Sequence, residues 1–327
     1  MPSEIMIETG INSAPPTWDE AVATAPVFYQ RSFLRAFEDT PLHPVLRHAY
    51  LHAPGIAVPV TLQHGVDPMR VLAEHFPAAR QRPVLLTHVW HCYETTLPGT
   101  GADTAPAAAV VRALRELGRR WEAGHFGFVN VPADSPTAAA LERLGLTAVP
   151  AEAGHGLDIS GFRHLDDYLA TLPSKPRRNL RHDLRRAADA DVVTAILPPA
   201  EADLDGFVDL ARRTAAKYGN ADYYRPGVFQ TFVRHLDSAR VIELRRGGRL
   251  IASAITLLDR RRYHFWCVGV DYDAAPGFSP FYTAFAEVMR DAIASGRPRL
   301  ELGRRNPDFK RRYGMRSTPL CSYLTRT

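Results

Sequence analysis

The stretch "VIELRRGGRLIASAITLLDRRRYHFWCVGV", residues 241–270, decides the fold. Two runs rich in β-branched residues flank Gly247 and Gly248. A pair of glycines in this position is a strong signal for a two-residue hairpin turn, because both turn positions need positive φ. A third run, rich in aromatic residues, follows the polar residues 259–261. We therefore predict a three-stranded antiparallel meander over residues 241–246, 249–258 and 262–270.

The segments around this meander predict helices and further strands. The sequence "SKPRRNLRHDLRR", residues 174–186, opens a basic helix in which Leu180 and Leu184 share a face that packs inward. Ser279, Pro280 and Gly296 bound another helix as N-cap, first-turn proline and C-terminal glycine. The other elements expected in this half are helices over residues 164–172, 201–219 and 226–236, and strands over residues 298–303 and 318–327.

The first half of the chain gives a similar alternation of helices and strands. Its pattern predicts helices over residues 28–39, 108–124 and 134–145, and strands over residues 55–63, 82–90 and 126–132. This half closes on a strand, a helix and a strand, and a new set of elements starts near residue 154. We therefore expect an α/β protein with a mixed sheet, divided into domains over residues 1–153 and 154–327.

Charge is distributed unevenly between these halves. Residues 1–155 hold 11 Lys and Arg against 15 Asp and Glu, a net charge of −4, whereas residues 156–327 hold 29 against 20, a net charge of +9. A basic half joined to an acidic half suggests that one domain meets an anion. For the basic helix three readings stay open: it grips nucleic acid, it holds an acidic small substrate, or it faces water.

Several function classes are not expected. The sequence has no run of 18 uncharged apolar residues that would span a membrane, and its beginning lacks the pattern of a signal peptide, so we expect a cytoplasmic protein. Cys92, Cys267 and Cys321 are odd in number and far apart, which argues against a disulfide framework or a zinc site. We assign no metal.

Four segments resemble the FemAB-like proteins of the GNAT acyltransferase superfamily. They are "YLATLPSKPRRNLRHDLRRA", "AKYGNADYYRPGVFQTFVRHL", the hairpin and aromatic strand of the meander, and "RLELGRRNPDFKRRYGM". The resemblance covers residues 156–327 well and residues 15–150 in outline. It implies tandem GNAT-like domains, the first of them degenerate, in an enzyme that joins an activated acyl group to an amine. Well-known members transfer aminoacyl groups from aminoacyl-tRNA to cell-wall peptide precursors, and relatives act in antibiotic pathways.

The resemblance also suggests site residues. It implies that Phe309 and Lys310 lie at the acyl-transfer centre, where Lys310 or the peptide between the two would stabilise the oxyanion; the alternative is a lysine in a solvated loop. Glu301 would accept the proton of the amine or pair with Lys310. The candidates for substrate binding are Lys217, Tyr218, Tyr224, Arg225, Tyr263, Tyr282 and Arg304. The plain reading of Lys217 is that it caps its helix, and an aromatic stripe such as the one containing Tyr263 more often belongs to the core.

The donor is judged from the segment before the helix at residues 279–296. An acyl-CoA enzyme of the GNAT type cradles pyrophosphate there with a glycine-rich basic loop and the helix N-terminus. Here "DYDAAPGFSPF", residues 271–281, has one glycine, two prolines, two aspartates and no cation. We therefore expect aminoacyl-tRNA as co-substrate and no bound cofactor, with acyl-CoA as the alternative donor and a non-enzymatic RNA-binding protein as a further alternative. The expected tRNA contacts are Lys175, Arg178, Arg181, Arg185, Arg311 and Arg312.

Overall fold

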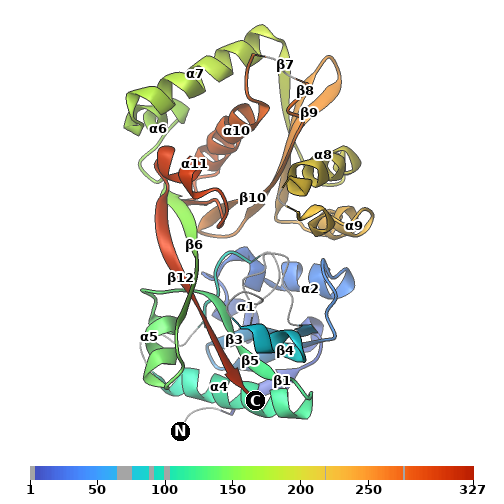
Figure 1. Cartoon of the computed structure of the whole chain (residues 1–327), viewed down its shortest axis with the longest axis vertical. Coiled ribbons are helices and arrows are strands. Elements are labelled where there is room, and N and C mark those ends of the chain that lie inside the picture. Colours follow the sequence, from blue (N-terminus) through green and yellow to red (C-terminus); the bar gives the residue numbers. More distant parts are fainter. Residues whose placement is uncertain (1–3, 65–75, 88–91, 99–103, 218, 275–276) are drawn as a thin grey trace. The chain divides into compact units, whose positions relative to one another are not determined.

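The chain forms two compact units (Figure 1). The computed structural model describes residues 4–64, 76–87, 92–98, 104–217, 219–274 and 277–327. The first unit comprises Met1–Gly154 and Thr318–Thr327, and the second comprises His155–Ser317. The expectation that residues 318–327 belong to the second domain is therefore corrected. Strand β12 (Arg316–Arg326) pairs antiparallel with β5 (His125–Pro132), which lies in the first unit.

The predicted meander is confirmed at the centre of the second unit. Strand β9 (Arg249–Leu258) pairs antiparallel with both β8 (Ala239–Arg246) and β10 (Arg262–Val270). Gly247 and Gly248 adopt φ of 54° and 80°, as the hairpin turn requires. Strand β7 (Val192–Leu197), which the sequence did not indicate, extends the sheet beyond β8. On the other side follow β11 (Arg299–Glu301), parallel to β10, and the end of β6 (Val149–Asp158).

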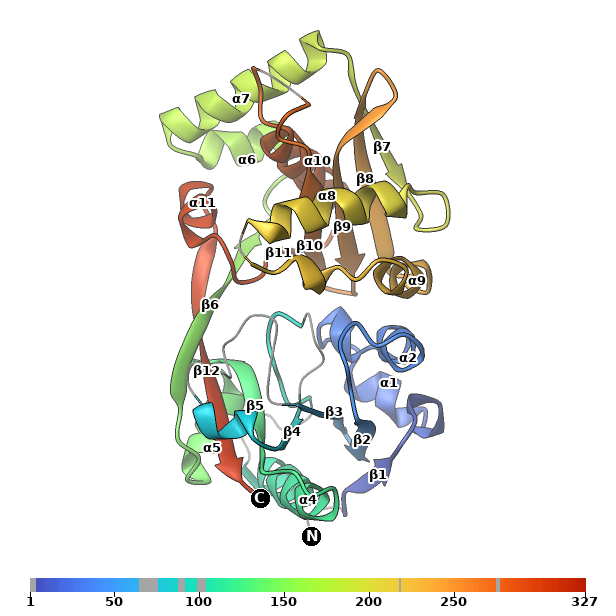
Figure 2. The ribbon, with the colours of Figure 1, turned by 45° about the vertical axis from the view of Figure 1, so that its right-hand side comes forward.

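Helices cover both faces of this sheet (Figures 1 and 2). Helices α6 (Leu165–Thr171), α7 (Ser174–Asp189) and α10 (Pro280–Ala294) lie on one face, and α8 (Leu204–Ala216) and α9 (Val228–Arg234) lie on the other. The inward stripe of the basic helix is confirmed, because Leu180 is fully buried and joins the core between α7, α10 and the sheet. A short helix, α11 (Pro307–Arg312), carries the predicted Phe309–Lys310 pair.

Close packing of α8 on β10 depends on Gly269. A Cβ atom at this position would lie 2.6 Å from the backbone nitrogen of Ala211 and 2.8 Å from the Cβ atom of Leu210. We expect Gly269→Ala to lower the free energy of unfolding by about 2 kcal/mol, because overpacking a well-filled interface forces the helix away from the strand. Urea unfolding measures the change. Gly161→Ala is the control, since a Cβ atom there meets nothing within 4 Å; equal losses in both variants would contradict the packing argument.

The first unit is also built on a mixed sheet. Its strand order is β1 (Met6–Glu8), β2 (Arg47–Ala53), β3 (Ile56–His64), β4 (Pro83–Leu86), β5 and β12. Strand β2 was not indicated by the sequence. Helices α4 (Thr104–Arg120) and α5 (Pro136–Arg143) pack on the core around Phe126 and Phe128. The other helices are α1 (Thr17–Ala21) and α2 (Arg31–Asp39). Across the described residues of both units, none of the helices is both long and apolar enough to traverse a bilayer.

Candidate active site

Strands β10 and β11 of the second unit pair over only part of the length of β10. They pair in parallel from Arg262 opposite Arg299 to His264 opposite Glu301, where β11 ends. Strand β10 continues to Val270, and a bulge at Trp266 shifts its register with β9. A bulge re-aims side chains and often lies next to a functional site. Within the described residues, β10 therefore continues beyond His264 without pairing to β11.

Lys310 lies in the helix that follows β11, and it is buried. Only 6% of the residue is exposed, and its Nζ donates a hydrogen bond of 2.9 Å to the carbonyl oxygen of Gly303. The same carbonyl accepts the backbone N–H of His155 at 3.1 Å. The alternative of a lysine in a solvated loop is therefore wrong. A buried ammonium group is costly unless it is hydrogen-bonded, and here it holds the loop that leaves β11.

Phe309 is a packing residue. Its ring centroid lies 4.9 Å from that of Phe281, 4.9 Å from that of Tyr313 and 5.2 Å from that of Phe285. Tyr282, at the start of α10, is half-buried and joins this aromatic cluster. The N–H of the Phe309–Lys310 peptide donates to the carbonyl of Asn306 at 3.3 Å. The expectation that this peptide holds the oxyanion is therefore wrong, because the first turn of α11 already uses its only donor.

Glu301 is buried at the end of β11. Its carboxylate forms an ion pair with Arg299, two residues earlier on the same face of the strand. A Cβ atom at Gly156 would lie 2.7 Å from Glu301 Oε2, so the neighbouring strand β6 leaves room for this carboxylate by carrying a glycine. An ion pair with Arg299 is thus one interaction of Glu301, and acceptance of the amine proton stays a prediction.

A second polar cluster lies beside β10, around the short helical turn Ala221–Tyr223. Tyr224 hydrogen-bonds the thiol of Cys267, and burial raises the pKa of that thiol well above its usual range. Burial and the Cys267 thiol also raise the pKa of Tyr223, while the positive charges of Arg304 and Arg305 oppose the rise. The turn therefore brings Tyr223 close to the loop that carries Arg304 and Arg305. Tyr223, Cys267 and Arg305 were not predicted, and the doubled tyrosine was the available signal.

The remaining substrate-binding candidates have different surroundings. Tyr263 is fully buried, and its hydroxyl donates to Asp291 at 2.6 Å, so its assignment to the substrate site is wrong. Lys217 is exposed, with its Nζ 4.1 Å from the centre of the Tyr272 ring. Arg225 is half-buried in the segment between Tyr224 and α9. Tyr218 lies outside the described residues.

The N-terminus of α10 is closed by the chain itself. Asp183, on α7, accepts the N–H of Ser279 at 3.0 Å, and the Ser279 hydroxyl accepts the N–H of Tyr282 at 3.4 Å. Pro280 has no N–H to offer. Arg186, also on α7, lies so close to Gly277 that a Cβ atom there would be 2.8 Å from its guanidinium. Asp183 and Arg186 lie in the basic helix that the sequence singled out, but neither was among the predicted contacts.

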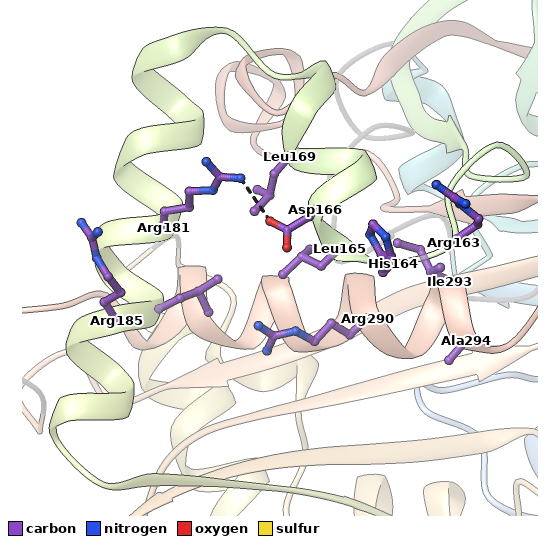
Figure 3. Close-up of a pocket in the computed structure, with 11 residues that line it drawn as sticks. Arg163, His164, Leu165, Asp166, Leu169, Arg181, Arg185, Arg290, Ile293 and Ala294 are labelled. Carbon is purple, nitrogen blue, oxygen red and sulfur yellow. Dashed lines mark hydrogen bonds and ion pairs between the residues drawn. The ribbon is translucent and has the colours of Figure 1, made fainter.

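The predicted tRNA contacts do not form one continuous row. Arg181 and Arg185 line a pocket between α6, α7 and α10, where Arg181 pairs with Asp166 at 3.1 Å (Figure 3). Lys175 and Arg178 are exposed on α7 but do not line that pocket. Arg311 and Arg312 are exposed on α11, and Arg311 pairs with Asp308 at 2.5 Å. Within the described part of the chain, no cluster of His, Cys, Asp and Glu could hold a metal ion.

Comparisons with known proteins agree with this architecture. Residues 174–311 match the acetyltransferase (GNAT) domain family. No curated protein matches the sequence significantly. The solved structure of FemX is similar, with a TM-score of 0.68 and 11% identity over 98% of this chain and 97% of that one. L-PGS from Bacillus licheniformis gives a TM-score of 0.59 and 12% identity over 97% and 93%.

A third solved structure is a tandem GNAT protein from the clavulanic acid biosynthesis pathway. It has a TM-score of 0.57 and 14% identity, over 99% of this chain and 98% of that one. At such identities these likenesses establish the fold alone. Residues 174–311 match the acetyltransferase (GNAT) domain, and the chain as a whole has a fold similar to that of FemX and of a tandem GNAT protein.

Proposed function

We propose that the protein forms amide bonds by moving an aminoacyl group from aminoacyl-tRNA to the amine of a small molecule or peptide. The observation that carries this proposal is the closed N-terminus of α10. The carboxylate of Asp183 occupies the Ser279 N–H, the Ser279 hydroxyl occupies the Tyr282 N–H, and Pro280 supplies none. These two N–H groups are therefore not available to the pyrophosphate of CoA, which binds through such donors.

The reaction is the aminolysis of an ester. The neutral amine attacks the carbonyl carbon, the C–N bond forms, and the C–O bond to the terminal ribose breaks. The ribose oxygen leaves with a proton that balances the one lost by the amine. In this proposal the Lys310 ammonium stabilises the negative charge that develops on the carbonyl oxygen. Glu301 is the proposed acceptor of the amine proton.

A donor test separates this proposal from its main alternative. With charged tRNA and an amine acceptor, we expect RNase treatment to abolish product formation, because the aminoacyl ester is delivered on RNA. Calorimetric titration with acetyl-CoA should give no binding heat, because Asp183 and Ser279 already use two of the N–H groups at the start of α10. Undiminished product after RNase would contradict the proposal, and saturable heat with acetyl-CoA would favour the alternative.

An acyl-CoA-dependent N-acyltransferase is the second candidate. It is favoured by the match of residues 174–311 to a family described as acetyltransferases. A non-enzymatic RNA-binding protein is less favoured, because residues 174–311 match an acetyltransferase domain. For the acceptor, we propose a precursor of the cell wall or of a secondary metabolite such as an antibiotic, in the cytoplasm where charged tRNA is found.

A further inference from the structure

The pocket between α6, α7 and α10 lies away from the acyl-transfer residues. It has a volume of about 550 Å³, and its apolar floor includes Leu165, Leu184 and Ile293. Guanidinium groups from several elements surround this floor (Figure 3). They are those of Arg163 before α6, Arg181 and Arg185 on α7, and Arg290 on α10. Such a combination of apolar floor and guanidinium rim suits a ligand with a flat apolar part and an anionic part.

The carboxylates near the pocket orient its arginines and leave donors over. Arg181 pairs with Asp166 at 3.1 Å, Arg163 with Asp167 at 3.5 Å, and Arg290 with Glu287. A guanidinium has five N–H donors, so a single carboxylate contact leaves most of them available to another anion. Arg185 has no hydrogen bond or ion pair with any residue that the structure describes. The pocket therefore has positioned donors and, in Arg185, an exposed guanidinium that can bind an anion.

The pocket and the acyl-transfer residues lie apart along α10. Arg290 lies ten residues along α10 from Pro280, where the helix meets the aromatic cluster of Phe309. At 1.5 Å per residue this is about 15 Å. An RNA strand carries a phosphate at every nucleotide and can contact both places.

We propose that this pocket binds one nucleotide unit, with its phosphate on Arg185 and Arg290 and its base against the apolar floor. Guanidinium groups match phosphate geometry, and bases stack on flat apolar or guanidinium surfaces. The identification of the nucleotide as part of the tRNA donor rests on the proposed function. A free nucleotide offers the same chemistry, and the experiment distinguishes the two sources.

The test measures binding of uncharged tRNA by fluorescence anisotropy at several salt concentrations. We expect Arg185→Gln and Arg290→Gln each to weaken binding about five- to ten-fold and to reduce the salt dependence by roughly one phosphate contact. Ala294→Phe fills the pocket without changing its charge, because Ala294 lines it and is exposed; it should weaken binding similarly. Arg234→Gln is the matched control, an exposed arginine on α9. Circular dichroism checks that each variant is folded.

Other results would identify a free nucleotide as the ligand of the pocket, overturn the pocket proposal or contradict the proposed donor. If Ala294→Phe leaves tRNA binding intact but abolishes the heat of ADP binding, the pocket takes a free nucleotide. The proposal is overturned if Ala294→Phe changes neither tRNA binding nor ADP binding. It is also overturned if Arg178→Gln weakens tRNA binding as much as Arg185→Gln does while Ala294→Phe has no effect, because the contact is then a diffuse basic surface. If tRNA binding depends on the pocket but product formation resists RNase, the proposed nucleotide pocket is supported and the proposed aminoacyl-tRNA donor is contradicted.

Discussion

Lys310→Met is expected to lower kcat/KM for acyl transfer by about 100-fold or more while the protein remains folded. Lys310 places a positive charge inside the second unit, 94% shielded from solvent, in the helix that follows β11. A preorganised charge in a water-poor environment stabilises an oxyanion far better than a solvated one does. Methionine keeps the volume and removes the charge. Steady-state kinetics with saturating acceptor measures the change, which should fall mainly on kcat.

The fold should tolerate this substitution. The Gly303 carbonyl keeps its hydrogen bond from the backbone N–H of His155 when the Lys310 ammonium is removed. We expect the free energy of unfolding to change by no more than about 1 kcal/mol. Arg297→Met is the matched control, because Arg297 also donates to a carbonyl, that of Asp259, at 2.9 Å. An active Lys310→Met enzyme, or an equal loss of activity in Arg297→Met, would refute the proposed role.

Asp291→Ala is expected to lower the free energy of unfolding by about 3 kcal/mol. Asp291, on α10, is 7% exposed and accepts two hydrogen bonds, one from Arg240 at 2.7 Å and one from the Tyr263 hydroxyl at 2.6 Å. Removing the carboxylate deprives a buried phenol of its acceptor and a guanidinium of its counter-charge. Arg240 is partly exposed, so most of the loss should come from Tyr263. Denaturant unfolding measures the change.

Tyr263→Phe separates a structural role from a substrate-binding one. This variant removes only the hydroxyl, and we expect a loss of about 1 kcal/mol in unfolding free energy with KM unchanged. The double variant Asp291→Ala/Tyr263→Phe should lose less unfolding free energy than the sum of the losses in the two single variants, because both substitutions disrupt the same hydrogen bond. A raised KM in Tyr263→Phe with normal stability would restore this residue to the substrate site.

Local sequence signals predicted the elements that depend on local chemistry. The Gly247-Gly248 turn fixed the hairpin between β8 and β9, and Ser279 with Pro280 began α10 as expected. Strands β2 and β7 escaped prediction. Their sequences, "RHAYLHA" and "VVTAIL", become strands because a neighbouring strand pairs with them. Pairing between distant segments is a tertiary interaction, and it overrides weak local preference.

In the candidate site, too, the sequence predicted what depends on local signals and missed what depends on tertiary contacts. The motif around Lys310 could be identified from sequence, but its burial and its bond to Gly303 could not, because they depend on where β11 ends and α11 begins. The closure of α10 by Asp183 was equally invisible, since Asp183 and Ser279 are 96 residues apart. Tyr263 was misassigned for a related reason: an aromatic residue in a strand has the same pattern whether it lines a core or a cleft.

By itself, the sequence determined the meander, the helices around it and the uneven charge, because turn geometry, helix capping and apolar periodicity act over a few residues. Only the tertiary structure decided that residues 318–327 pair with β5, that Asp183 occupies the start of α10, and that Arg181 and Arg185 line a pocket while Arg178 does not. These features depend on which distant backbone segments pack together. That packing is set by the burial of whole helix and sheet faces, and no short stretch of the chain encodes it.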